Sequence, residues 1–405
     1  MNAIKTLGLT AAAALLATAA PADQTVRFWY HFDNPDNPMD ALIRQFEEAN
    51  PGIRIEAENI PWNSYYDNLY TAIVGGSAPD ALMVKLFAQP RLLEMGALTD
   101  LTDRIAQWDG REQLLDGILD INAGPDGRQY YLPVQYVVLY LYYNAAMFEQ
   151  AGLQPPGTCE DFLTAARALT GDTDGDGRTD RWGFGFRGAR GGHDHWASFV
   201  LAHEGVEIDD GLTSEAGIAA IQWVIDLHRE HGVFPPSAPN DGFQEIIAGF
   251  QQERTAMTIH HIGSANGMAQ ALGDRVSAVP VPECGGGRWT AFGDESLAIL
   301  SSAQDPDAAW RWISFLSSPG ANALFNQATG QLPITRPDTE TWEGHPRRFV
   351  DATAASLPYA RTLPDSPATA DFVNTVWPRA MQRALNGEIT AEAMAREIEG
   401  LFAGR

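Results

Sequence analysis

Three things are scarce in this chain of 405 residues: cysteine, long apolar runs and basic side chains. The two cysteines, Cys159 and Cys284, are too few for a scaffold held by several disulfides or for a four-cysteine zinc site. No stretch reaches the roughly 18 uninterrupted apolar residues of a membrane-spanning helix, so we expect a protein that is not embedded in a membrane. The 27 Lys+Arg residues face 52 Asp+Glu, a formal net charge of −25, which disfavours nucleic acid and anionic lipid as partners.

What is present is the composition of a folded protein. Hydrophobic residues make up 45% of the chain and charged residues 20%, so the chain can bury a core. The length predicts two or three domains, or one large unit with two lobes.

The first 22 residues have the three parts of a secretory signal peptide. Lys5 gives a positive start, residues 7–17 form an apolar run, and Ala20-Pro21-Ala22 supplies small residues before a cut ahead of Asp23. No cysteine lies near this cut, so we expect no lipid anchor there. The segment predicts an exported protein.

The residues that follow alternate between strand and helix patterns. Residues 25–30 and 53–57 are rich in β-branched or alternating apolar residues and predict strands. Between them, residues 39–49 place apolar side chains at helical spacing and end at Asn-Pro-Gly. A helix over 62–74 and a buried strand over 80–84 continue the pattern. This order predicts an α/β fold with a parallel sheet.

The middle and C-terminal parts are less regular. The apolar-aromatic run 130–143 contains Pro133 and Gln135 and is too uneven for a single strand. Further helices are predicted over 160–169, 215–230, 308–317 and 369–385.

Short motifs spread along the chain are typical of one family. They are 46–55 (FEEANPGIRI), 77–80 (SAPD), 131–133 (YLP), 141–144 (LYYN), 148–153 (FEQAGL), 250–259 (FQQERTAMTI) and 330–333 (GQLP). In this order they resemble the extracellular solute-binding proteins that deliver sugars to ABC importers, the group typified by maltodextrin-binding protein. The resemblance covers nearly the whole chain after the signal peptide.

The resemblance implies a bilobed periplasmic-binding-protein fold, with two discontinuous α/β lobes joined by hinge crossovers. The N-terminal lobe would comprise 23–134 plus 277–318, and the C-terminal lobe 135–276 plus 319–405. The crossovers would fall near 133–135, 276–280 and 317–319. Proline and glycine at such points can absorb the dihedral changes of a hinge closure.

A sugar needs hydrogen-bonding side chains for its hydroxyl groups and aromatic rings for its C–H faces. Ligands of open α/β sheets bind at the carboxyl ends of strands, which selects His31 and Asp33 after the first strand and Lys85 after the strand over 80–84. The resemblance adds Gln135 and Tyr136 at the first crossover. It also adds His261, at the end of a strand over 256–259.

The loop 183–196 is the next candidate region. Its G-x-G-x-x-G pattern is not followed directly by a helix, so we do not interpret it as a dinucleotide loop. The resemblance implies that this loop brings backbone and an aromatic side chain to the ligand. The predicted set of ligand contacts also includes Arg187, His193, Trp196, Gly293, Asp294, Glu295, Arg336 and Trp377. Core packing remains an alternative for both tryptophans.

The cations Lys85, Arg187 and Arg336 leave the charge of the ligand open. They would suit an anionic sugar, with an acidic, phosphorylated or sulfonated group, whereas pairing with local carboxylates would leave a neutral sugar or polyol. We expect the neutral ligand.

An aspartate-rich loop indicates a structural calcium site. Side-chain oxygens stand at loop positions 1, 3, 5 and 9, a backbone carbonyl at 7 and a glycine at 6, as at the start of an EF-hand loop. Position 12 is Gly183, so the bidentate glutamate of that loop is missing. The predicted ligands are Asp172, Asp174, Asp176, Arg178 (through its carbonyl) and Asp180. The alternative is an acidic surface turn without a metal.

Oxidation of Cys159 and Cys284 is possible outside the cytoplasm. The implied lobe map puts the two residues in different lobes, where a bridge would restrain the hinge. We therefore expect two free thiols.

The function implied by the resemblance is that of a monomeric periplasmic protein that captures a sugar or polyol and delivers it to the membrane permease of an ABC importer. No organic cofactor and no catalysis are expected. One alternative is a secreted carbohydrate-active enzyme, although no H-E-x-x-H or G-x-S-x-G motif occurs in the chain. A sensor that presents its ligand to a receptor kinase would have the same binding chemistry.

Overall fold

The computed structural model describes residues 24–32 and 37–403, and the predicted signal peptide lies outside this part. The strands of this part form one nine-stranded mixed sheet in the order β2-β1-β3-β8-β4-β6-β5, with β7 on β4 and β9 on β8. Their bounds are β1 (Gln24–Tyr30), β2 (Ile53–Asn59), β3 (Ala81–Val84), β4 (Leu132–Asn144), β5 (Trp182–Gly185), β6 (Thr255–His261), β7 (Val276–Val279), β8 (Thr290–Ile299) and β9 (Ala360–Arg361).

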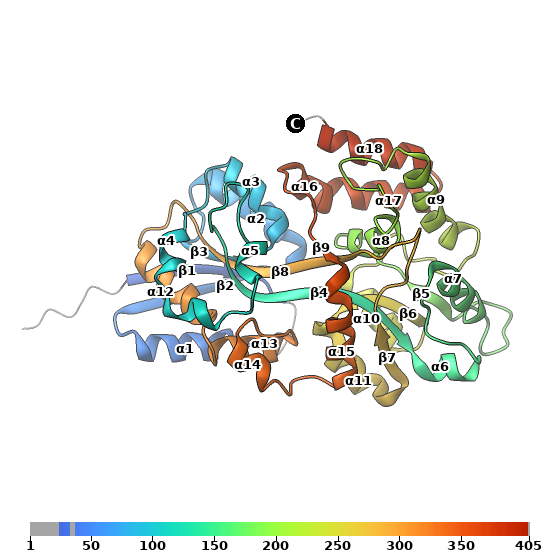
Figure 1. Ribbon diagram of the computed structural model, residues 1–405, viewed down its shortest axis with the longest axis horizontal. Helices are drawn as coiled ribbons and strands as arrows, with labels where there is room; N and C mark the ends of the chain where they lie inside the picture. Colours follow the sequence, from blue (N-terminus) through green and yellow to red (C-terminus); the bar gives the residue numbers. More distant parts are fainter. Residues whose placement is uncertain (1–23, 33–36, 404–405) are drawn as a thin grey trace, which may run out of the picture.

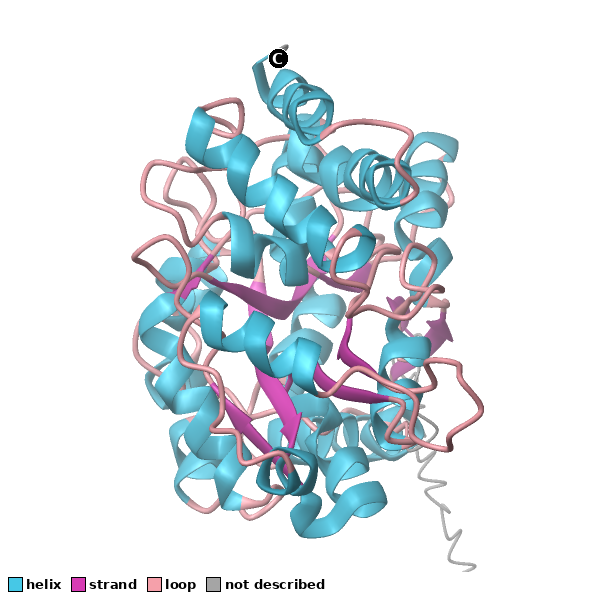
Figure 2. Ribbon diagram, turned by 90° about the vertical axis from the view of Figure 1, so that its right-hand side faces the viewer, coloured by secondary structure: helices cyan, strands magenta, loops and turns pink. Residues whose placement is uncertain are grey.

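Helices cover the strands in two groups, one at each end of the sheet (Figure 1). Seen along the long axis, helices surround the strands (Figure 2). The first group is α1 (Met39–Ala49), α2 (Trp62–Gly75), α3 (Gln89–Glu94), α4 (Thr102–Ala106), α5 (Ile118–Ile121), α12 (Pro306–Leu316), α13 (Ala321–Thr329) and α14 (Arg336–Glu340). The second is α6 (Ala145–Gln150), α7 (Cys159–Ala168), α8 (His193–Val200), α9 (Glu215–Arg229), α10 (Phe243–Gln251), α11 (Ala265–Leu272), α15 (Arg347–Ser356), α16 (Ala368–Asp371), α17 (Trp377–Leu385) and α18 (Ala391–Ala403). We call the parts around them the first and the second lobe.

The first lobe begins with the strand–helix–strand unit that the sequence predicts. β1 pairs in parallel with β2 and with β3. Helix α1 buries Met39, Leu42 and Phe46, and the Phe46 ring packs edge-on to Trp312 of α12, with 5.2 Å between the ring centroids. The helix ends before Asn50 because Pro51 cannot continue it. The predicted limits of α1 are confirmed.

Two long strands, β4 and β8, run from one lobe into the other (Figure 1). The first half of β4 pairs with β8 and its second half with β6 and β7. The prediction that residues 130–143 are too uneven for one strand was wrong. The β4–β8 register shifts between Pro133 and Gln135, and such an irregularity accommodates a proline that cannot donate a ladder hydrogen bond.

The helix predicted over 369–385 is interrupted. It consists of α16 and α17, joined by the π-helical turn η6 (Phe372–Val376). π-helical turns are rare in proteins, and those that occur often lie at functional sites.

The two cysteines form a disulfide, so the expectation of free thiols was wrong. Their Cα atoms are 5.2 Å apart, and Cys284 is buried in the same hydrophobic cluster as Phe162 of α7 and Trp196 of α8. The bridge therefore lies within the second lobe and does not cross between lobes. The implied lobe map failed here because β7 pairs with the second half of β4 and keeps the following residues with that lobe.

Another segment packs against the lobe opposite to the expected one. Ala321 and Phe325 of α13 belong to the cluster around Trp312 in the first lobe, although 319–405 was expected in the second. The expected lobe ranges as a whole stay a prediction. Among residues 24–32 and 37–403, no helix combines the length and the apolar character needed to cross a bilayer.

Candidate functional site

The carboxyl ends of strands from both lobes carry polar side chains toward the junction between the lobes. His31 follows β1 and Lys85 follows β3 in the first lobe, whereas Arg187 follows β5 and His260 and His261 end β6 in the second. Carboxyl ends of strands are where open α/β sheets bind ligands. These residues form the two walls described next.

The first-lobe wall is a buried group of three charged or polar residues. The Glu295 carboxylate of β8 lies 3.3 Å from His31 Nε2 and forms an ion pair with the Lys85 ammonium group. Glu295 and His31 are buried, and Lys85 is partly exposed. Burial raises the pKa of the Glu295 carboxyl, but Lys85 and His31 outweigh this effect and the pKa lies below its ordinary value. Glu295 is therefore a charged acceptor held between two donors.

Trp62, the first residue of α2, completes this wall. Its ring centroid lies 4.9 Å from that of His31 and 5.4 Å from Lys85 Nζ. Its side chain is partly exposed, unlike the buried Tyr65 and Tyr66 one turn on. An aromatic ring beside a carboxylate and an ammonium group is the combination that a sugar requires. Trp62 was not predicted because it follows β2, whereas the candidates chosen in this lobe follow β1 and β3.

The second-lobe wall is built around a pair of histidines. The rings of His260 and His261 have centroids 4.1 Å apart. His261 Nδ1 accepts a hydrogen bond from the Gly263 backbone N–H at 3.0 Å, so the proton of the neutral ring is on Nε2. Burial lowers the pKa of His260 to about 3. The pKa of His261 is also far below its ordinary value, through burial first and then the positive charges near it, which include Lys85 of the first lobe.

A charged pair lies beside these histidines. Asp194 of α8 is partly exposed, and its Oδ1 is 3.2 Å from His193 Nε2. Burial raises the pKa of Asp194, but His193, His195 and Arg187 together bring the pKa below its ordinary value. The direct partner of Asp194 is therefore His193, and the positive charge of Arg187 acts on the carboxylate as well.

The start of α8 is packed so closely that residue 192 has to be glycine. A Cβ atom on Gly192 would lie 1.6 Å from the Arg187 carbonyl oxygen and 3.0 Å from the Trp377 ring. The close approach places the Arg187 backbone against α8 and α17.

Two contacts join the lobes beside these walls. Arg190 Nη1 donates to the Asn63 carbonyl of α2 at 2.6 Å, and Arg91 Nη1 of α3 donates to Asp371 Oδ1 of α16 at 2.5 Å. Phe87 packs against the hydrophobic clusters of both lobes.

Comparison with known proteins identifies the family. The family model of the bacterial extracellular solute-binding proteins matches residues 33–323, which is more than half of the chain. The chain belongs to this family. Its members bind solutes outside the cytoplasm.

Three relatives show how far the likeness extends. A binding protein from Brucella abortus is 24% identical over 403 residues, 96% of this chain and 95% of the relative. The sn-glycerol-3-phosphate-binding periplasmic protein UgpB from Agrobacterium fabrum is 21% identical over 418 residues, 98% of this chain and 92% of the relative. A solute-binding protein from Thermotoga lettingae, solved with α-D-tagatose, has a TM-score of 0.81 and 23% identity, covering 94% of this chain and 100% of that one. The last similarity shows the bilobed fold.

The structure brings together five of the predicted contact residues of this solute-binding protein. They are His31, Lys85, Arg187, His261 and Glu295. Gly293 lies next to them on β8, opposite Val137 of β4. Asp33 and the side chain of Asp294 lie outside the described residues. That these residues contact the ligand stays a prediction.

Other predicted residues are covered by protein. Trp196 and Trp377 are each 0% exposed, with ring centroids 6.4 Å apart, and His193 packs edge-on to Trp377. In this arrangement neither tryptophan offers a free ring face, and a ligand could stack on them only if α17 moved. The three residues form the aromatic support behind the second-lobe wall.

The remaining candidates lie at the edges of the site. Gln135 is buried, and its Oε1 accepts a hydrogen bond from Thr329 at 3.5 Å. Tyr136 is largely covered, and burial raises its pKa to about 12. Arg336 lies on the protein surface, where its guanidinium is 2.6 Å from Asp116. Arg336 therefore pairs with a local carboxylate and does not join the two walls.

The aspartate-rich loop brings three of its carboxylates together. Oxygen atoms of Asp172, Asp174 and Asp176 all lie within 4.8 Å of one another. Gly177, at position 6, has a φ of 87°, the left-handed conformation that the sharp turn requires. Asp180 does not join the three, because its carboxylate accepts hydrogen bonds from Thr173.

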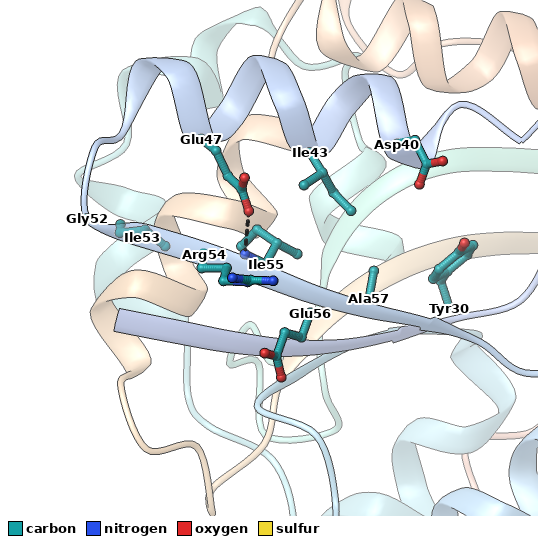
Figure 3. A pocket seen from close by; sticks show the side chains of 10 residues that line it. All are labelled: Tyr30, Asp40, Ile43, Glu47, Gly52, Ile53, Arg54, Ile55, Glu56 and Ala57. Atoms are coloured by element: carbon teal, nitrogen blue, oxygen red, sulfur yellow. Dashed lines mark hydrogen bonds between the residues drawn. The ribbon is translucent and has the colours of Figure 1, made fainter. Parts of the chain in front are cut away.

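A surface hollow of about 660 Å³ lies elsewhere, at the outer edge of the first lobe (Figure 3). It opens between α1 and the edge strand β2, where Glu47 accepts a hydrogen bond from the Ile55 N–H at 2.9 Å. The chemistry of the two walls is not found there, and we do not assign the ligand to it.

Proposed function

We propose that this protein captures a sugar or polyol between its two lobes and delivers it to the membrane permease of an ABC importer. The observation that carries the proposal is the meeting of strand ends from both lobes, with Glu295 and Lys85 on one wall and His261 on the other. Family membership and the tagatose complex of the T. lettingae relative support it. The protein acts in the periplasm after removal of residues 1–22, as a monomer and without catalysis.

The side chains of the two walls match the groups of a sugar. Glu295 accepts hydrogen bonds from hydroxyl groups, whereas Lys85 and the Nε2–H of His261 donate to them. The partly exposed ring of Trp62 covers a C–H face. Because these groups come from both lobes, the ligand stabilises the closed form and shifts the population toward it. The long strands β4 and β8 carry the hinge.

The charges of the walls favour an uncharged ligand. Lys85 is paired with Glu295, which offsets its charge, and the nearby Asp194 carboxylate partly offsets the charge of Arg187. Arg336, which would have suited an anion, pairs with Asp116 at the surface. An anionic sugar is the second candidate, supported by the name of the A. fabrum relative, which binds sn-glycerol 3-phosphate.

A ligand panel tests the proposal. We expect a stoichiometric rise in melting temperature with a neutral sugar such as tagatose or maltose, or with a polyol, and no consumption of that compound. Glucuronate and glycerol 3-phosphate serve as the anionic arm. Turnover of any compound would support the secreted carbohydrate-active enzyme instead, and a panel without any binding would contradict the proposed function.

We further propose that Asp172, Asp174 and Asp176 hold a structural Ca²⁺, with the Arg178 carbonyl as a further ligand. Asp180 would complete the set by exchanging its hydrogen bonds from Thr173 for the ion. Three clustered carboxylates repel one another, and a hard cation relieves this repulsion. Calcium should raise the melting temperature of chelator-treated protein, and Asp174→Asn should reduce the rise. An unchanged melting temperature and no heat of binding in calorimetry would refute the site.

A further inference from the structure

One contact across the junction begins at Arg190, in the loop between β5 and α8 of the second lobe. Its Nη1 donates to the Asn63 carbonyl at 2.6 Å, and its Nη2 lies 3.6 Å from Asp67 Oδ2. Both partners belong to α2 of the first lobe. Nη2 also donates to the Asn374 carbonyl of η6 at 3.5 Å. One guanidinium group, only 17% exposed, therefore connects α2 with the C-terminal helices.

A second contact joins the same two regions. Arg91 of α3 forms an ion pair with Asp371 of α16 at 2.5 Å, and both side chains are about one-third exposed. The Arg91 guanidinium also lies over the Tyr70 ring of α2, 4.7 Å from its centroid. Asp371 and Asn374 are three residues apart, so both arginines contact one short segment around η6.

The place of the Arg190 contact links it to the candidate ligand wall. Asn63 follows Trp62 directly, and Trp62 packs against His31 and Lys85. A hydrogen bond to the Asn63 carbonyl therefore holds the first turn of α2, and with it the Trp62 ring, only when the lobes are together.

We propose that Arg190 and the Arg91–Asp371 pair form a clasp that stabilises the closed form, and that Arg190 is a positioning residue for Trp62. The proposal rests on the proposed function, because it assigns the clasp to closure over a ligand between the lobes. The clasp bonds exist only in the closed form, so their free energy adds to that of the ligand contacts. A partly exposed ion pair of this kind changes an equilibrium constant by about three- to fivefold.

Matched ion pairs within a single lobe provide controls. Arg104–Asp307 at 2.5 Å joins two elements of the first lobe, and Arg383–Glu397 at 3.0 Å joins two helices of the second. Neither pair crosses the junction. Asp307→Asn and Arg383→Gln therefore remove a charge pair without changing the clasp.

The first experiment needs no ligand. Small-angle X-ray scattering should give a larger radius of gyration for ligand-free Arg190→Gln and Asp371→Asn than for the wild-type protein, and no increase for the two controls. Equal radii for all five proteins would overturn the clasp. This result is independent of the proposed function, because no sugar is present.

The second experiment measures binding of tagatose, or of the panel sugar that stabilises the wild type most. Asp371→Asn should weaken the affinity about three- to fivefold through faster dissociation. Arg190→Gln should weaken it further and change the fluorescence of Trp62, a change that Trp62→Phe abolishes. Wild-type affinity in both variants would overturn the proposal, whereas a wild type that binds nothing would contradict the proposed function instead.

Discussion

The two walls at the lobe junction are built from different chemistry. On the first-lobe wall, Glu295 is charged and held by Lys85 and His31, and the aromatic partner Trp62 is partly exposed. On the second-lobe wall, His260 and His261 are neutral; His260 is buried and His261 is partly exposed.

The difference indicates that one wall contributes mainly to ligand affinity and the other mainly to the stability of the fold. The first wall keeps a charge and an aromatic face available, so a substitution there should change ligand affinity more than folding. The second wall stands on the packed rings of Trp196, Trp377 and Phe372, so a substitution there should change folding first. Each prediction below sets one wall against the other.

The largest effect should come from the aromatic support of the second wall. Trp196→Ala removes a side chain that is 0% exposed and should lower the free energy of unfolding by about 4 kcal/mol. Trp62→Ala in the first wall should lower it by no more than about 1 kcal/mol, because the ring is partly exposed, but should weaken sugar binding. Urea denaturation and calorimetric titration measure the two quantities. Equal losses of unfolding free energy in the two variants would contradict this difference between the two walls.

The ion pair of the first wall should come next. Glu295→Gln leaves Lys85 without its carboxylate in a largely buried place and should cost about 3 kcal/mol of unfolding free energy. It should also abolish detectable sugar binding, because a ligand acceptor is lost.

Asp307→Asn is the matched control for Glu295→Gln. It breaks the pair with Arg104 on the surface of the same lobe, where Asp307 is 80% exposed, and should cost less than about 1 kcal/mol. Sugar binding should stay at the wild-type level. A loss of binding in this variant would mean that the first wall responds to any charge change in its lobe.

Local elements of the fold, such as helix limits, could be predicted from the sequence. Pairings between residues far apart in the chain could not. Helix α1 was predicted with its correct limits because apolar spacing and a following Asn-Pro-Gly are local signals. Strand β4 was not predicted as one strand because Pro133 usually disfavours a strand. Its irregular pairing depends on β8, which lies far along the chain. The disulfide was missed for the same reason, since the lobe of Cys284 depends on the pairing of β7.

The candidate site divides in the same way. His31, Lys85 and His261 could be selected because each follows a strand, and the topology brings strand ends together. That Trp196 and Trp377 are covered could not be predicted, because burial depends on the packing of α8 against α17 and η6. Trp62 could have been found by also testing the residues after the strand over 53–57.

A pH dependence should also distinguish the two walls. The folded-state pKa of His260 is about 3, below its ordinary value of 6.5, because burial disfavours the charged ring. Below pH 6.5 the unfolded chain binds a proton that the folded chain does not, so stability falls as the pH falls from 6.5 toward 3, by up to about 1.4 kcal/mol per pH unit. The lowered pKa values of His261 and His195 act in the same direction.

The carboxylates titrate lower. The pKa of Glu295 and that of Asp194 lie below their ordinary values, so their contribution to stability is lost only as the pH falls below about 4.5. Urea denaturation at pH 7.0, 6.0 and 5.0 should therefore report the histidines, together with Asp241 and Asp365, whose pKa values burial raises, but not Glu295 or Asp194. His260→Gln should have a shallower slope than the wild type over this range, whereas Glu295→Gln should keep the wild-type slope. If His260→Gln also kept it, His260 would not be the neutral, buried base of the second wall, and the contrast between the two walls would not hold.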